Sequence, residues 1–131
     1  MIDTVDVFVG RFADRFEATS YTEPRWEDEP DETASDDEYD AWEERNPIWP
    51  LRAELGGRLD PDFIETIDEP ARYEYLAGLL VDPTAIEEIR RTAANANVLV
   101  LVFEESKDPR TSTPCVSTSR LTYCGRFACR L

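Results

Sequence analysis

Hydrophobic and polar residues follow the patterns of strands in three parts of this chain. Valine occupies every second position from Val5 to Val9, which predicts a strand over 4–12. The run VLVLVF at 98–103 is apolar throughout, which is typical of a central strand covered on both faces. Alternation returns over 118–130, and the last two strands are expected to form an antiparallel pair.

The strand predicted over 118–130 contains an irregularity. Four of its apolar residues share one parity, the pattern of one face of a strand: Leu121, Tyr123, Phe127 and Cys129. Gly125 interrupts the alternation and is therefore expected to mark a β-bulge.

Short helices are predicted between the first and second strands. Capping and breaking residues favour a short helix over 13–19, a loop over 23–34 and a helical turn over 50–55. Ser35 is a candidate N-cap, and Glu38 three residues later completes a capping box. The helix that they begin is expected to end near Arg45, because Asn46-Pro47 follows.

Acidic residues beside prolines predict three further helix starts. They are found at Asp60-Pro61, at Asp68 before Glu69-Pro70, and at Asp82-Pro83. The strongest pattern covers 83–96, where apolar residues spaced by three and four make one helix face: Ile86, Ile89, Ala93 and Ala96.

This order of elements predicts one domain over 1–131 of the α/β (α+β) class. We expect a small mixed sheet of about three to four strands with helices packed on it. No apolar run reaches the roughly 20 residues that span a bilayer, and no signal peptide is recognised. The odd count of cysteines, Cys115, Cys124 and Cys129, fits reduced thiols. A cytoplasmic protein without a membrane contact is therefore expected.

The net charge of the chain indicates which classes of partner it can bind. The formal net charge is −15, from 29 acidic and 14 basic residues. Such a domain is not expected to bind nucleic acid through its phosphates, and it should associate quickly with a basic protein. Twelve acids against two arginines give −10 between Glu23 and Arg45, whereas 106–131 carries +4. An acidic, loop-rich segment at 23–46 is therefore a candidate interaction surface.

All three tryptophans lie in or beside this acidic segment. Rigid aromatic anchors among steering charges suit a protein-binding surface. Two interpretations stay open for Trp42, as an anchor for a partner or as a core residue, whereas Trp49 is expected in the core.

The residue types leave little room for catalysis. The chain has no histidine, so Ser-His-Asp and Cys-His arrangements are impossible. Asp60, Asp62 and Glu65 could supply a hydrolytic carboxylate pair, but acids are also expected where a helix begins. The glycine of an EF-hand loop is absent from the acidic run. We therefore expect no enzymatic role, no catalytic residue, no metal ion and no cofactor.

The segment PLRAELGGRLDPDFIETI, at 50–67, resembles the central motif of the immunity protein 22 family of bacterial polymorphic toxin systems. The opening strand VDVFVGRF and the segments NANVLVLVFE and LTYCGRF also match that family's pattern, in the same order. The chain departs from it at 23–49, which is more acidic, and at 106–117, which contains Cys115.

The resemblance implies a cytoplasmic antidote that binds and blocks a cognate toxin, a nuclease or another enzyme with a basic cleft. The expected contact residues lie between Trp26 and Glu44: Trp26, Asp28, Glu29, Asp31, Glu32, Asp36, Asp37, Glu38, Tyr39, Asp40, Trp42, Glu43 and Glu44. An alternative toxin-binding face is formed by Asp60, Asp62 and Glu65. The alternative function is an acidic nucleic-acid mimic or adaptor that binds a host DNA-handling protein.

Overall fold

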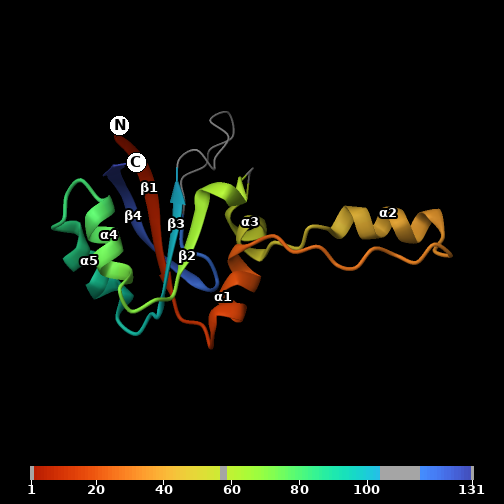
Figure 1. Ribbon diagram of the computed structural model, residues 1–131, viewed down its shortest axis with the longest axis horizontal. Helices are drawn as coiled ribbons and strands as arrows, with labels where there is room; N and C mark the ends of the chain where they lie inside the picture. Colours follow the sequence, from red (N-terminus) through yellow and green to blue (C-terminus); the bar gives the residue numbers. More distant parts are fainter. Residues whose placement is uncertain (1, 57–58, 104–115, 131) are drawn as a thin grey trace.

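The computed structural model describes residues 2–56, 59–103 and 116–130 and shows a four-stranded sheet with helices on both faces (Figure 1). The strands are β1 (Ile2–Gly10), β2 (Ile64–Ile67), β3 (Val98–Phe103) and β4 (Leu121–Arg130). Their order in the sheet is β2-β3-β1-β4, and all three pairings are antiparallel. The expected α+β class and single small sheet are confirmed.

Two pairs of helices cover the two faces of the sheet, as Figure 1 shows. Helices α1 (Arg15–Thr22) and α3 (Pro50–Leu55) enclose one core with Phe8 and Leu51. Helices α4 (Arg72–Leu79) and α5 (Ala85–Ala93) enclose the other core. All six residues of β3 are buried, so this strand is central and covered on both faces as its apolar run predicts.

The helix face predicted for 83–96 is confirmed in α5. Ile86, Ile89 and Ala93 are buried against the sheet, and Ala96 packs on the same core from just beyond the helix. Asp82 supports the first turn, because its carboxylate accepts hydrogen bonds from the backbone N–H and the hydroxyl of Thr84.

The predicted pairing of the last two strands is wrong, and so is the prediction that the sheet is mixed. β1 lies between β3 and β4 and pairs antiparallel with both. β2 supplies the second neighbour of β3, again antiparallel. β3 therefore runs opposite to both of its neighbours, and no parallel pair occurs among the described strands.

The helix predicted at Asp60-Pro61 is also wrong. Asp60 does act as a cap, accepting from the N–H of Asp62 at 3.0 Å, but only the 3-10 turn η1 (Pro61–Phe63) follows. The chain then enters β2, because pairing of this β-branched segment with β3 outweighs the local helix start. The next helix, α4, begins at Arg72, four residues after Asp68.

The bulge predicted in β4 is confirmed, and it divides the residues expected on one face. Val7 pairs with Gly125 and Phe8 with Tyr123, so Cys124 is the extra residue. Gly125 has a φ of +124°, which favours glycine. The register shift turns Leu121 and Tyr123 toward the α1/α3 core but Phe127 and Cys129 toward the α4/α5 core.

The two described cysteines lie in the body of the protein. Cys129 is buried in the α4/α5 core, and Cys124 is half-buried, where burial raises the pKa of its thiol to about 11. Cys115 and most of the loop predicted at 106–117 lie outside the described residues. None of the described helices has the length and apolar character needed to cross a membrane.

A buried carboxylate joins β1 to β4. Asp6 is 1 % exposed, and its Oδ1 accepts a hydrogen bond from the Tyr123 hydroxyl at 2.6 Å. Arg126 lies 3.3 Å from the same oxygen. Because the carboxylate of Asp6 is buried, these partners must balance its charge, and breaking the network destabilises the fold.

Replacing this carboxylate should destabilise the body. Asp6→Ala removes a buried acceptor of the Tyr123 hydroxyl and of Arg126, and should lower the free energy of unfolding by about 2–3 kcal/mol in urea titrations. Tyr123→Phe keeps the ring that packs on Phe8 and should cost only about 1 kcal/mol. A change below about 0.5 kcal/mol for Asp6→Ala would contradict this role.

Candidate functional site: the acidic arm

Residues 25–48 form an arm that stands away from the sheet (Figure 1). The chain leaves the body in extended form and returns through α2 (Asp36–Arg45), none of whose residues is buried. At the base of the arm, which we call the neck, Arg25 and Ile48 exchange two backbone hydrogen bonds of 2.9 and 2.7 Å. The two halves of the arm are therefore held together where they join the body.

The predicted cap explains why α2 forms away from the core. The hydroxyl of Ser35 accepts a hydrogen bond from the N–H of Glu38 at 3.2 Å, as the sequence predicts. Three acids occupy the first turn and Arg45 the last, which suits the helix dipole. Because a ten-residue helix is marginal alone in water, it needs further contacts along the arm.

Aromatic rings supply those contacts. The Trp42 ring packs on Trp26 and on Tyr39, with centroid separations of 5.5 and 5.4 Å. The indole N–H of Trp42 donates to the carbonyl of Glu27 at 3.2 Å, and the Tyr39 hydroxyl donates to Glu29 at 3.1 Å. These residues join α2 to the extended half of the arm.

The two tryptophans that could face a core behave differently. Trp42 packs against Trp26 and Tyr39 on the arm and is half-buried there, so it is not a residue of the body core. Trp49 is 8 % exposed, lies in the α1/α3 core and donates its indole N–H to the carbonyl of Thr22 at 2.7 Å. The core position expected for Trp49 is confirmed.

A polar network closes the arm next to the neck. Asn46 accepts from the N–H of Glu27 and donates to the carbonyl of Trp42 and to the Glu27 carboxylate. Arg45 contacts the same carboxylate at 2.5 Å. The hydrogen bond from Arg45 holds the pKa of Glu27 below its usual value.

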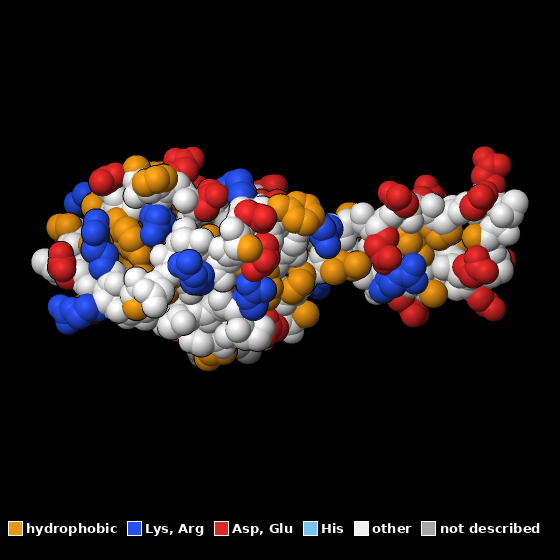
Figure 2. Space-filling view, turned by 90° about the horizontal axis from the view of Figure 1, so that it is seen from below, with side chains coloured by type: hydrophobic (Ala, Val, Ile, Leu, Met, Phe, Trp, Pro, Cys, Tyr) orange, Lys and Arg blue, Asp and Glu red, His pale blue; other side chains and the backbone are white. Residues whose placement is uncertain are grey.

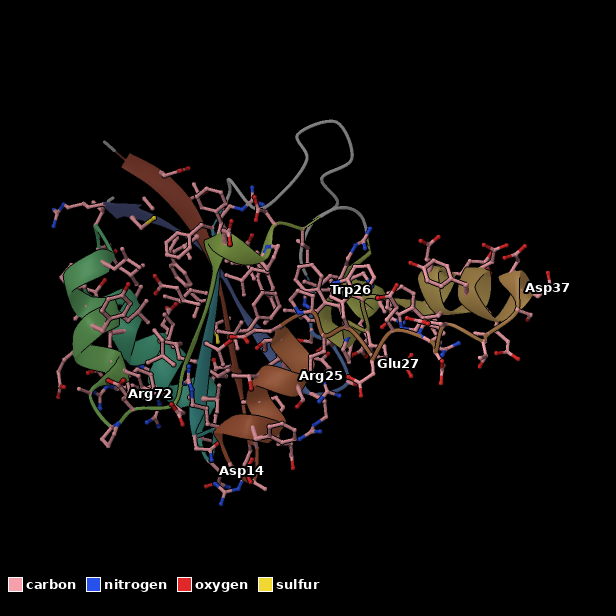
Figure 3. All side chains as sticks on the ribbon, turned by 45° about the vertical axis from the view of Figure 1, so that its right-hand side comes forward. Asp14, Arg25, Trp26, Glu27, Asp37 and Arg72 are labelled. Atoms are coloured by element: carbon pink, nitrogen blue, oxygen red, sulfur yellow. The ribbon has the colours of Figure 1, made fainter. Side chains whose placement is uncertain are left out.

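The structure brings all the predicted contact residues of the acidic segment onto this arm. Half-buried Tyr39 and Trp42 lie between its two halves, and the others are exposed: Trp26, Asp28, Glu29, Asp31, Glu32, Asp36, Asp37, Glu38, Asp40, Glu43 and Glu44. Figure 2 shows acidic side chains around the arm and apolar side chains at the neck. In Figure 3, Asp37 lies at the far end, whereas Trp26 and Glu27 lie near the body.

The alternative face does not form one carboxylate site. Asp60 is engaged as a cap of η1, and Asp62 is exposed on that turn. Glu65 instead accepts from the Tyr75 hydroxyl at 2.8 Å and lines a hollow of about 310 Å³ between β2 and α4. Neither Asp60 nor Asp62 lines that hollow. Within the described residues, no group of three acidic or cysteine side chains is placed to hold a metal ion.

Sequence reasoning missed the residues that build the neck. Asn46 signalled a helix end, but its two hydrogen bonds to Glu27 in the other half of the arm have no local signature. Phe16 of α1 is 71 % exposed there, with the Arg25 guanidinium 5.8 Å from its ring centroid. The exposure of Phe16 and its contact with Arg25 are properties of the folded chain, so no local pattern in the sequence marked them.

Comparison of the chain with models of protein families, with curated proteins and with solved structures gave no match. The candidate site therefore stands on its own geometry: an exposed acidic arm with an aromatic cluster and a hydrogen-bonded neck.

The neck can be weakened without disturbing the sheet. Asn46→Ala removes three hydrogen bonds within the arm and should speed amide hydrogen exchange in α2 on the order of a hundredfold, because each bond contributes about 1 kcal/mol. Mass spectrometry of exchanged peptides measures this, with the urea midpoint of the body unchanged.

The matched control is Asn97→Ala. Asn97 makes similar side-chain bonds to the backbone of Phe12, but inside the body. This variant should lower the urea midpoint and leave exchange in α2 unaltered. Equal effects of both variants on α2 would show that the arm does not fold as a separate unit.

The pKa of Glu27 sets an acid limit for the neck. The ionised form is favoured in the folded arm, so its contribution to stability is complete above the ordinary pKa of about 4.5. It is lost as the pH falls through the lowered pKa. Carboxyl NMR shifts should show Glu27 titrating below the ordinary pKa of about 4.5, and titration at or above that value would contradict the ion pair.

Proposed function

We propose that this protein is an antidote that binds a bacterial toxin domain through the acidic arm and blocks it. The observation that carries the proposal is the concentration of exposed carboxylates on a structured arm that projects from the body. The partner is a protein with a basic cleft, such as a nuclease, and the antidote needs no catalytic group, metal ion or cofactor of its own.

The charge and shape of the arm support this proposal. Eleven acids against two arginines give the 24 residues of the arm nine net negative charges, which steer a basic partner and speed encounter. Helix α2 is about 15 Å long, so the arm can enter a cleft that the broader body cannot. Carboxylates that fill such a cleft occupy the place of an anionic substrate.

The motif that resembles the immunity protein 22 family supports the choice of a toxin as partner. In the structure this motif builds the body: Leu51 is the buried residue of α3, Gly56 ends that helix with a φ of +77°, and Ile64 begins β2. The motif therefore positions the arm, and the arm, where the chain departs from the family's pattern, would read the particular toxin.

Co-expression tests this function. A candidate toxin domain encoded beside this gene should stop growth alone and permit growth when this protein is made with it. In purified form, the two should associate at a rate that falls as salt is added. Absence of both rescue and binding, with the neighbouring domain shown to be toxic, would refute the pairing.

Charge reversal tests the arm. The triple variant Asp36→Lys, Asp37→Lys and Asp40→Lys should slow association about tenfold or more at low salt, weaken its salt dependence and reduce rescue. The matched control reverses three exposed acids of α4 and α5: Glu74→Lys, Glu87→Lys and Glu88→Lys. It changes the net charge equally and should have a much smaller effect.

Equal effects of the two triple variants would show that only total charge matters and that the arm is not the contact surface. Binding to several DNA-handling proteins of the host, without protection from a neighbouring toxin, would instead support the nucleic-acid-mimic alternative. Its supporting observation is the same display of carboxylates along both halves of the arm.

A further inference from the structure

Aromatic rings on the body of this protein repeatedly hold arginine side chains. Arg120 lies 4.5 Å from the ring centroid of Phe12, and Tyr73 lies between Arg72 and Arg90 at 5.0 and 4.7 Å. At the neck, Arg25 lies over Phe16 in the same way. Such contacts combine the ring quadrupole with the flat, weakly hydrated guanidinium.

The Trp26 ring on the arm resembles these sites, but no side chain of the described residues places a cation over it. It is 60 % exposed, although it packs on Trp42. Among the described residues, no arginine or lysine lies over this ring. Arg25, its neighbour in the chain, lies over Phe16, and Arg45, the arginine of α2, is engaged with Glu27.

Three acidic residues follow this exposed ring in the sequence. Glu27, Asp28 and Glu29 follow Trp26 directly, and Asp28 is exposed. The rings continue along the arm through Trp42 to Tyr39, which hydrogen-bonds Glu29. An aromatic face beside carboxylates suits a cation, because the cation can stack on the ring while its N–H groups donate to carboxylate oxygens.

We infer that Trp26 is the docking point for an arginine side chain in a basic segment of the partner. The inference rests on the proposed function and names the chemistry that the arm recognises. Arginine suits the site better than lysine, because a planar guanidinium stacks on an indole and still directs donors at its edge toward carboxylates. A purely apolar segment suits it less well, because docking on the ring would desolvate the neighbouring carboxylates without pairing them.

The test uses the whole protein and two peptides, octa-arginine and octa-lysine, which have equal charge. Isothermal titration calorimetry at two salt concentrations measures the affinity for each peptide. Because the peptides have equal charge, the contribution of charge alone cancels in the ratio of the two affinities. The wild-type protein should bind octa-arginine more tightly, and Trp26→Ala should reduce its affinity by about 2- to 30-fold, the range expected for a cation–π contact. The same variant should alter the affinity for octa-lysine less, so that the two peptides converge.

Two further variants separate stacking from folding and from apolar area. Trp26→Phe keeps an aromatic ring on Trp42 and should retain part of the preference for arginine. Trp26→Leu keeps apolar area without a π face and should lose it. Circular dichroism shows for each variant whether α2 is intact.

The matched control is Tyr75→Ala. Tyr75 is another exposed aromatic residue beside a carboxylate, Glu65, but it lies on α4 of the body. This control should leave the affinity ratio of the peptides unchanged. If the ratio survives in Trp26→Leu, or falls equally in Tyr75→Ala, Trp26 is not the arginine site.

The outcome is separable from that of the proposed function. Growth rescue that depends on Asp36, Asp37 and Asp40, together with peptide affinities that ignore Trp26, would refute this inference alone. A Trp26-dependent preference for arginine without protection from any neighbouring toxin would keep the arginine site and refute the antidote.

Discussion

The apolar side chains of β3 point alternately to the two faces of the sheet, and each face must be covered. Helices α1 and α3 cover one face, and α4 and α5 cover the other. This double burial brings together segments that are far apart in the chain. It also determines where the chain must leave the body between α1 and α3, and that is where the arm begins.

The arm is stabilised by different interactions. Its residues bury no side chain in either core, and its order comes from the ring contacts of Trp42, the cap of Ser35 and the hydrogen bonds of Asn46. Repulsion among its carboxylates opposes compaction and is screened by salt. The arm is therefore exposed and highly charged, and a few local contacts keep it folded.

Under the proposed function, this difference between body and arm gives a physical reason why the arm departs from the pattern that the chain resembles. Residues of the segment at 50–67 are constrained by packing and turn geometry, as Leu51 and Gly56 illustrate. Exposed acids such as Asp37 and Asp40 carry no such packing constraint. A contact surface placed on the arm can change with its partner while the two cores of the body stay the same.

The sequence by itself determined the elements whose signals are local. Capping by Ser35, the apolar face of α5, the buried strand VLVLVF and the bulge at Gly125 all follow from residue type and spacing, as does the acidity of the arm. Tertiary structure decided which strands pair, because pairing depends on partners distant in sequence. It turned 64–67 into β2 despite the helix start at Asp60, and it placed β1 between the last two strands.

The same distinction between local sequence signals and tertiary contacts applies to the candidate site. Composition identified the carboxylates and tryptophans, but only the folded chain separates Trp49 from Trp42, one indole in the core and one on the arm. Only the folded chain shows that Trp26 is exposed. Contacts between the two halves of the arm form the neck at Arg25 and Ile48 and the polar network of Glu27 and Asn46 beside it. The spacing of residues in the sequence does not predict such contacts, because they stabilise the arm only when both of its halves are in place.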